Sequence, residues 1–119
     1  MRVVLYCRVA SPDQANAGLE SQEQCLRKYA EEQGYEITGV IEETGSGLSM
    51  DRPGIREIYA KAEQGAMDRV LAQSLCRYTR APASEFFGFI KALAGMGITA
   101  STLHENYLRG MFPTLRNLP

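Results

Sequence analysis

The hydrophobic pattern of the chain alternates between short apolar runs and longer stretches with helical spacing. Residues 3–6 form a continuous apolar run, which is typical of a strand covered on both faces. Residues 35–41, 69–72 and 98–103 are short segments with β-forming side chains, so we predict them as the second, third and fourth strands.

Three helices are predicted between these strands. The first covers residues 19–33, and the second and third begin at Pro53 and Pro82, because proline suits the first turn of a helix. Each is followed by a glycine, the residue most common just beyond a helix: Gly34, Gly65 and Gly97. Two apolar stripes with helical spacing mark the buried faces of the second and third helices: Ile55, Ile58, Tyr59 and Ala62, and Phe86, Phe89, Ile90 and Leu93.

The alternation of strand and helix predicts the fold class. It indicates an α/β domain with an open, mostly parallel sheet of four to five strands flanked by helices. A chain of 119 residues suits one such domain, which we place at residues 1–104. Residues 105–119 have no clean period, and we interpret them as a C-terminal tail or as the truncated start of a longer element.

Four arginines lie in the segments that follow the first three predicted strands: Arg8, Arg52, Arg77 and Arg80. These segments, residues 7–14, 43–52 and 74–80, are expected to meet at one edge of the sheet, where α/β proteins place their binding sites. Arginine presents a planar fork of donors that matches phosphate oxygens. We therefore predict an anion or phosphate site, although each arginine alone fits a solvated or salt-bridged role equally well.

Composition narrows the class of function. The net charge of −1 argues against a general binder of nucleic acid. Three cysteines without a CxxC pair and a single histidine, His104, predict no metal, and they fit the reducing cytoplasm. No apolar run is long enough to cross a membrane. Nucleotide-binding glycine motifs are absent, so we expect no cofactor, and a small-molecule α/β enzyme or a flavodoxin-like binder is the less favoured alternative.

Four segments carry recognisable motifs in a fixed order. They are residues 6–14 (YCRVASPDQ), 18–22 (GLESQ), 46–54 (SGLSMDRPG) and 75–80 (LCRYTR). Together they resemble the motifs of the serine recombinases, the resolvase/invertase family, over roughly residues 1–104. The resemblance implies the N-terminal catalytic domain of that family and its resolvase-like sheet.

The resemblance also implies an activity and partners. Serine recombinases cut and rejoin DNA without metal: a serine hydroxyl attacks a backbone phosphate and forms a phosphoserine link, while cationic groups stabilise the phosphoryl oxygens. Their full-length subunits pair as homodimers on DNA and join as homotetramers for strand exchange. Carried over to this chain, the residues implied at the scissile phosphate are Arg8, Arg52, Arg77 and Arg80 as its ligands, with Gln22 and Gln14 positioning it.

Two positions depart from the family pattern. Ala10 stands where the family has its nucleophilic serine, and Cys76 stands where it has an aspartate. Ser11 is the nearest hydroxyl, but adjacent side chains of an extended backbone point to opposite faces. Ser11 is therefore a candidate substitute nucleophile or, as the alternative, a turn residue before Pro12. The Cys76 thiol is either a small replacement for the lost acid or a reactive thiolate next to arginines.

These departures leave two hypotheses within the family. In one, the chain is a recombinase catalytic domain with Ser11 as its nucleophile. In the other, it is a catalytically dead relative that keeps the fold and the arginines, and acts in DNA binding or protein assembly. Family members continue into a long dimerisation helix and a DNA-binding domain, so residues 105–119 are expected to be a tail or the truncated start of that helix.

Overall fold

The computed structural model describes residues 1–12 and 15–103, and within them the chain forms a four-stranded, all-parallel sheet. Its order is β2-β1-β3-β4, and the strands span Arg2–Val9 (β1), Glu36–Thr44 (β2), Arg69–Ala72 (β3) and Thr99–Thr102 (β4). The helices span Ala15–Gln33 (α1), Pro53–Glu63 (α2), Leu75–Tyr78 (α3) and Ala83–Gly95 (α4). The predicted fold class is confirmed. Gln14 and the predicted tail, residues 105–119, lie outside the described residues.

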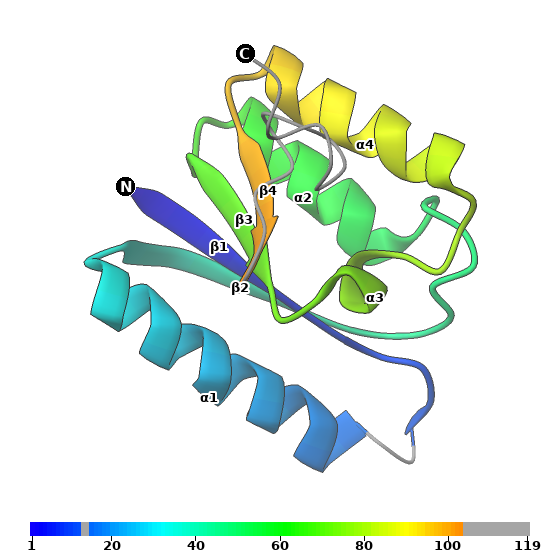
Figure 1. Ribbon diagram of the computed structural model, residues 1–119, viewed down its shortest axis with the longest axis horizontal. Coiled ribbons are helices and arrows are strands. Elements are labelled where there is room, and N and C mark those ends of the chain that lie inside the picture. The colour runs from blue at the N-terminus through cyan, green and yellow to red at the C-terminus, as the bar shows by residue number, and fades with distance from the viewer. Residues whose placement is uncertain (13–14, 104–119) are drawn as a thin grey trace.

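The helices cover both faces of the sheet. Figure 1 shows α1 on one face and α2 and α4 together on the other. On β1, Val4 and Tyr6 point into the core beneath α2 and α4, while Val3, Leu5 and Cys7 pack with α1. Because β1 is central and covered on both sides, its residues are continuously apolar, as predicted from the run at residues 3–6. No helix in the described residues has the length and apolarity needed to cross a membrane.

The predicted apolar stripes of the second and third helices are confirmed. The buried residues of α2 include Ile55, Ile58 and Ala62, and Tyr59 packs partly buried against the same core. All four residues of the α4 stripe are buried. The three glycines predicted to end helices have φ between 70° and 76°, which is the left-handed region that glycine enters without steric cost.

Several boundaries differ from the prediction. Strand β1 spans Arg2–Val9 and not only residues 3–6, so Arg8 is part of the strand and not of the segment after it. Helix α1 begins four residues before residue 19, because the small residues there carry no apolar stripe that a pattern could reveal. Strand β2 extends beyond residue 41 to Thr44, so Glu43 is part of the sheet and not of the following loop. No helix was predicted within residues 74–80, the segment after the third strand, but Leu75–Tyr78 forms the short helix α3.

The unequal lengths of the strands create the place for a site. Strand β3 pairs with β1 only at Val3–Leu5, whereas β2 accompanies β1 as far as Val9. Beyond Leu5, the side of β1 that faced β3 therefore has no neighbouring strand. Helix α3 lies in this position, directly after β3, and it contacts β1 (Figure 1).

Candidate functional site

Arg8 lies near the carboxyl end of β1 and is buried, with 3% of its surface exposed. Its Nε donates a hydrogen bond to the carbonyl of Arg77 at 2.9 Å. Nη1 donates to the carbonyl of Gly45 at 2.6 Å, and Nη2 to that of Cys76 at 2.7 Å. Burial lowers the pKa of this guanidinium, and the nearby cations Arg52 and Arg77 act in the same direction.

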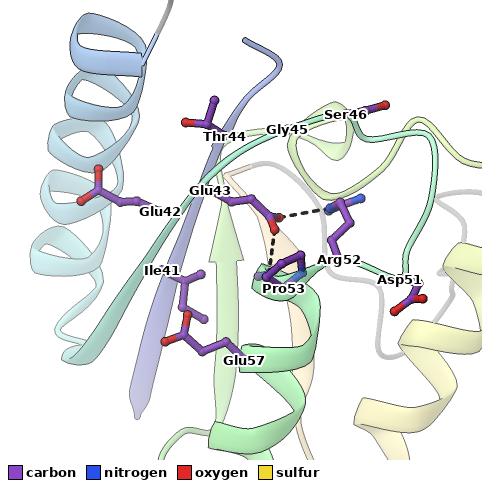
Figure 2. Close-up of a pocket in the computed structure, with 11 residues that line it drawn as sticks. Ile41, Glu42, Glu43, Thr44, Gly45, Ser46, Asp51, Arg52, Pro53 and Glu57 are labelled. Atoms are coloured by element: carbon purple, nitrogen blue, oxygen red, sulfur yellow. Dashed lines mark hydrogen bonds and ion pairs between the residues drawn. The ribbon is translucent and has the colours of Figure 1, made fainter. Parts of the chain in front are cut away.

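Arg52 immediately precedes α2 and is also buried, with 5% exposed. Its Nε lies 3.1 Å from Oε1 of Glu43 in an ion pair that Figure 2 shows as a dashed line. Nη1 donates to the carbonyl of Ser49 at 2.7 Å. Nη2 donates to the Tyr6 hydroxyl at 2.8 Å and to the Tyr78 carbonyl at 2.5 Å. The predicted phosphate ligand Arg52 is thus fully engaged with protein groups.

Glu43 is the centre of this buried network. Its carboxylate accepts hydrogen bonds from the Tyr6 hydroxyl at 2.5 Å, from Arg52, and from the Gly54 backbone N–H at 2.7 Å. Burial acts to raise the pKa of Glu43, but these donors outweigh it and hold the pKa below the ordinary value of 4.5. Burial and the hydrogen bond to Glu43 both raise the pKa of Tyr6, which therefore remains a neutral donor.

The remaining two arginines line a small concavity at the end of β1. Its volume is about 210 Å³, and its walls are formed by Arg8, Ala10, Cys76, Arg77 and Arg80. Among the described residues, no carboxylate lies within ion-pair distance of the three arginines in these walls. The structure therefore brings three of the four predicted arginines together around an unneutralised positive charge, and it places Ala10 among them.

Arg77 and Arg80 differ from Arg8 in being accessible. Arg80 is exposed and Arg77 is partly exposed. Nη1 of Arg77 donates to the carbonyl of Arg8 at 3.3 Å, and its Nε is buried without a hydrogen-bond partner within the described residues. The backbone N–H of Arg80 donates to the carbonyl of Gly47 at 2.6 Å. The guanidinium groups of Arg77 and Arg80 are thus the ones available to an incoming anion.

Ala10 and Cys76, at the positions of the family's nucleophile and acid, line the concavity, whereas the candidate substitute Ser11 does not. Ala10 presents a methyl group to it, and Cys76 is exposed on α3, with its Sγ 3.2 Å from Oγ of Ser74. Ser11 is partly exposed, and it is not among the described residues that form the walls. No cluster of metal-ligating side chains occurs in the described part of the chain.

Gln22 lies on α1, and the structure places its amide against the backbone of Arg8. Its Oε1 accepts the Arg8 N–H at 3.0 Å, and its Nε2 donates to the Arg8 carbonyl at 2.9 Å. Gln22 is buried. Its side chain therefore replaces the backbone partners that β1 lacks beyond the end of β3.

A larger pocket of about 650 Å³ lies beside β2 and the start of α2 (Figure 2). Its walls include the carboxylates of Glu42, Asp51 and Glu57. An anion would be repelled there, so the smaller arginine-lined concavity suits an anion better despite its size.

Glu43 and Tyr6, which hold Arg52, were not predicted as site residues from the sequence. One signal was available for Glu43: a carboxylate at the end of a strand close to a cluster of arginines is a natural partner for one of them. Only the register of the sheet, in which Arg8 is opposite Glu43, shows how close the two strand ends lie.

Comparison with known proteins agrees with the fold. Residues 3–114 match the family model described as "Resolvase, N terminal domain". The chain is similar to the C-terminal catalytic domain of ISC1926 TnpA, an IS607-like serine recombinase, with 31% identity, a TM-score of 0.79, and coverage of 87% of this chain and 70% of that one.

Two further structures have the same fold. The N-terminal catalytic domain of TP901-1 integrase has 26% identity and a TM-score of 0.81, with 93% of this chain and 85% of that one covered. A resolvase family site-specific recombinase from Streptococcus pneumoniae has 26% identity and a TM-score of 0.75, with 87% and 72% covered. The chain therefore belongs to the resolvase family, as a serine recombinase N-terminal domain.

Proposed function

We propose that this chain is a DNA recombinase catalytic domain that binds a backbone phosphate between Arg77 and Arg80, and whose own cleavage step is impaired at Ala10. One observation carries the proposal: a buried Arg8 and two accessible arginines line one concavity, and none of the three has an ion-pair partner among the described residues. A buried positive charge is costly unless an anion compensates it. A phosphate supplies that anion, and three arginines around it match the clamp used in phosphoryl transfer.

The missing step can be stated in terms of bonds. With a serine at position 10, the hydroxyl oxygen forms a bond to phosphorus, the P–O3′ bond breaks, and a proton passes to the departing 3′ oxygen. Ala10 has no lone pair to donate. Cys76, at the place of the family aspartate, carries no carboxylate to orient the arginines or move the proton.

A second function is supported by the same two departures, Ala10 and Cys76. Without a nucleophile the domain acts as a DNA-binding or protein-assembly module that keeps the phosphate site. On either proposal the partners are DNA and further copies of the full-length protein, as a homodimer or homotetramer, in the cytoplasm. Ser11 remains the candidate nucleophile of the active version, and it would have to turn into the concavity to act.

A covalent-capture assay separates these versions. The wild type, Ser11→Ala and Ala10→Ser are incubated with a pool of nicked, mixed-sequence duplexes, and protein–DNA adducts are detected on denaturing gels. We expect an adduct only with Ala10→Ser, and a larger amount of adduct when Cys76→Asp is added to that variant. A wild-type adduct that disappears in Ser11→Ala would make Ser11 the nucleophile. DNA binding without an adduct in any variant would favour the binding module.

DNA binding itself is tested through its dependence on salt. Each phosphate neutralised by a cationic group contributes about 0.9 to the slope of log K against log salt for duplex DNA. Arg80→Gln is expected to reduce this slope by about one contact. Arg27→Gln on α1 changes the net charge equally but lies outside the concavity, so it should leave the slope unchanged. A wild type that fails to bind DNA at low salt would refute the proposal.

A further inference from the structure

Cys76 is the one cysteine of the chain that lines the arginine-rich concavity, as far as the described residues form its walls. Its side chain is exposed on α3, and its Sγ lies 3.2 Å from Oγ of Ser74. Cys7 has no exposed surface, and Cys25 is partly buried on α1. A reagent that reacts with Cys76 therefore leaves its product at the concavity.

The walls around this thiol hold hydrogen-bond donors that have no acceptor. A guanidinium has five N–H donors. The buried guanidinium of Arg8 makes three hydrogen bonds to backbone carbonyls, which leaves two donors without a partner among the described residues. The Nε of Arg77 is buried and also has no partner there. Unused donors on positively charged groups are what an anion satisfies.

We infer that Cys76 is a covalent modification site for small disulfides that carry a carboxylate, and that the mixed disulfide formed on it closes the concavity to a DNA phosphate. The inference rests on the proposed function for its second half, since it adds a reversible control to the same phosphate site.

Electrostatic attraction gives this site its selectivity. No carboxylate is among the described residues that line the concavity, and Arg80 adds an exposed cation to its walls. A cleft lined by charge of one sign concentrates solutes of the opposite sign and raises their rates of association by about 10-fold to 1000-fold. An anionic disulfide is therefore drawn towards Cys76, whereas a cationic one is repelled.

The reaction is thiol–disulfide exchange. The thiol of Cys76 loses its proton to solvent, and the thiolate attacks one sulfur of the disulfide. A bond forms between Sγ and that sulfur, the original S–S bond breaks, and the departing thiolate takes up a proton from solvent. One half of the reagent stays on Cys76 with its carboxylate beside the arginines, and a free thiol reverses the exchange.

The size of the concavity makes modification and phosphate binding exclusive. Its volume is about 210 Å³, and Cys76 forms part of the same walls as Arg77 and Arg80. A carboxylate attached to Sγ occupies this space and accepts hydrogen bonds from the same guanidinium groups. A backbone phosphate then loses both its donors and its room.

Labelling with two matched disulfides tests the selectivity. Dithiodipropionate carries a carboxylate at each end and cystamine an ammonium, and both are small dialkyl disulfides. Mass spectrometry of peptides gives the rate of adduct formation at each cysteine in low salt near pH 8. We expect Cys76 to react about tenfold or more faster with dithiodipropionate, and added salt to reduce this preference. Equal rates, or a faster reaction with cystamine, would overturn the inference.

Two variants of equal charge show whether the arginines of the concavity cause the preference. Arg80→Gln removes a cation from its walls, and Arg27→Gln removes one from α1, outside it. The preference of Cys76 for the anionic reagent should fall several-fold in Arg80→Gln and remain in Arg27→Gln. Equal losses in the two variants would mean that only the net charge matters, and would contradict the inference.

DNA binding measures whether the modified site is closed. Wild-type protein treated with dithiodipropionate should bind a mixed-sequence duplex about tenfold or more weakly, because contacts to a charged group are lost. Dithiothreitol should restore the binding. Cys76→Ser, treated in the same way, controls for reaction at Cys25 and should bind equally before and after treatment. A complete adduct on Cys76 that leaves the affinity unchanged would refute the closing of the site.

Failure of this inference is distinguishable from failure of the proposed function. A wild type that binds no DNA at low salt refutes the proposed function, and with it the closing of a phosphate site. The labelling rates still decide in that case whether Cys76 is a modification site for anions, since they are measured without DNA.

Discussion

The side-chain amide of Gln22 bonds the Arg8 backbone as a neighbouring strand would: it accepts the Arg8 N–H at 3.0 Å and donates to the Arg8 carbonyl at 2.9 Å. Both hydrogen bonds form beyond the last residue of β1 that pairs with β3. The resemblance to the recombinases implied a contact between Gln22 and the phosphate. The structure gives both polar atoms of this side chain a backbone partner, and whether it also meets a phosphate stays a prediction.

Truncating Gln22 should destabilise the fold. Gln22→Ala leaves the buried Arg8 N–H without its partner, which costs about 1–3 kcal/mol, while the Arg8 carbonyl keeps its bond from Arg77. Urea denaturation measures the change in the free energy of unfolding. Gln24→Ala on the exposed side of α1 is the matched control and should change it by less than about 0.5 kcal/mol. Equal effects of the two variants would contradict the role of Gln22.

Removing Glu43 should be more damaging, since it leaves Arg52 buried without a counter-charge. The two side chains are 9% and 6% exposed, and breaking a buried pair by deleting one partner costs about 3–5 kcal/mol. Glu43→Ala should therefore lower the free energy of unfolding by about that amount in urea denaturation. Glu57→Ala on the exposed side of α2 provides the control. A cost below about 1 kcal/mol for Glu43→Ala would show that the pair is not buried in solution.

Glu43 should also contribute to acid sensitivity. Its folded-state pKa is lowered by its hydrogen bonds, so the stability that its ionised form contributes is fully present above about pH 4.5 and is lost as the pH falls through the folded-state pKa. Glu43→Gln cannot ionise and should show a flatter loss of stability below pH 4.5. Thermal or urea unfolding at several acidic pH values measures this. Parallel curves for the two proteins would count against it.

Two glycines provide a paired test of packing. A Cβ at Gly54 would lie 2.5 Å from Oε1 of Glu43, a carboxylate held by three donors that cannot easily move. A Cβ at Gly39 would meet its nearest neighbours at ordinary distances of 3.5–3.6 Å. Gly54→Ala should cost about 1–3 kcal/mol, whereas Gly39→Ala should be neutral or slightly stabilising. Urea unfolding measures both variants, and a lower midpoint for Gly39→Ala than for Gly54→Ala would contradict the prediction.

The cysteines should differ in reactivity. Cys76 is exposed, while Cys7 has no exposed surface and burial raises the pKa of its thiol to about 12. Iodoacetamide near pH 8 should therefore modify Cys76 in the folded protein and reach Cys7 only through unfolding. Mass spectrometry of peptides measures the two rates. Modification of Cys7 as fast as that of Cys76 would disagree with the buried position of β1.

The sequence alone determined the architecture. A fully buried central strand must be apolar on both faces, so the apolar run at residues 3–6 predicted β1 and the helices that cover both faces of the sheet. Local signals also located α2 and β3 correctly. Proline at position 53 marks the start of a helix, and residues 69–72 are a short run of β-forming residues that is followed by polar residues. The four arginines were identified as a cluster because parallel strands end at one edge of the sheet.

Only the tertiary structure decided which arginines are buried and which groups they contact. Arg8 and Arg52 are satisfied largely by backbone carbonyls of distant segments, and a carbonyl is present at every residue, so no sequence pattern can single one out. The Arg80 side chain is exposed, while its backbone N–H donates to the Gly47 carbonyl. Which arginines are buried and which are accessible arises from long-range packing, which is why the sequence predicted a cluster of arginines but not the burial of each one.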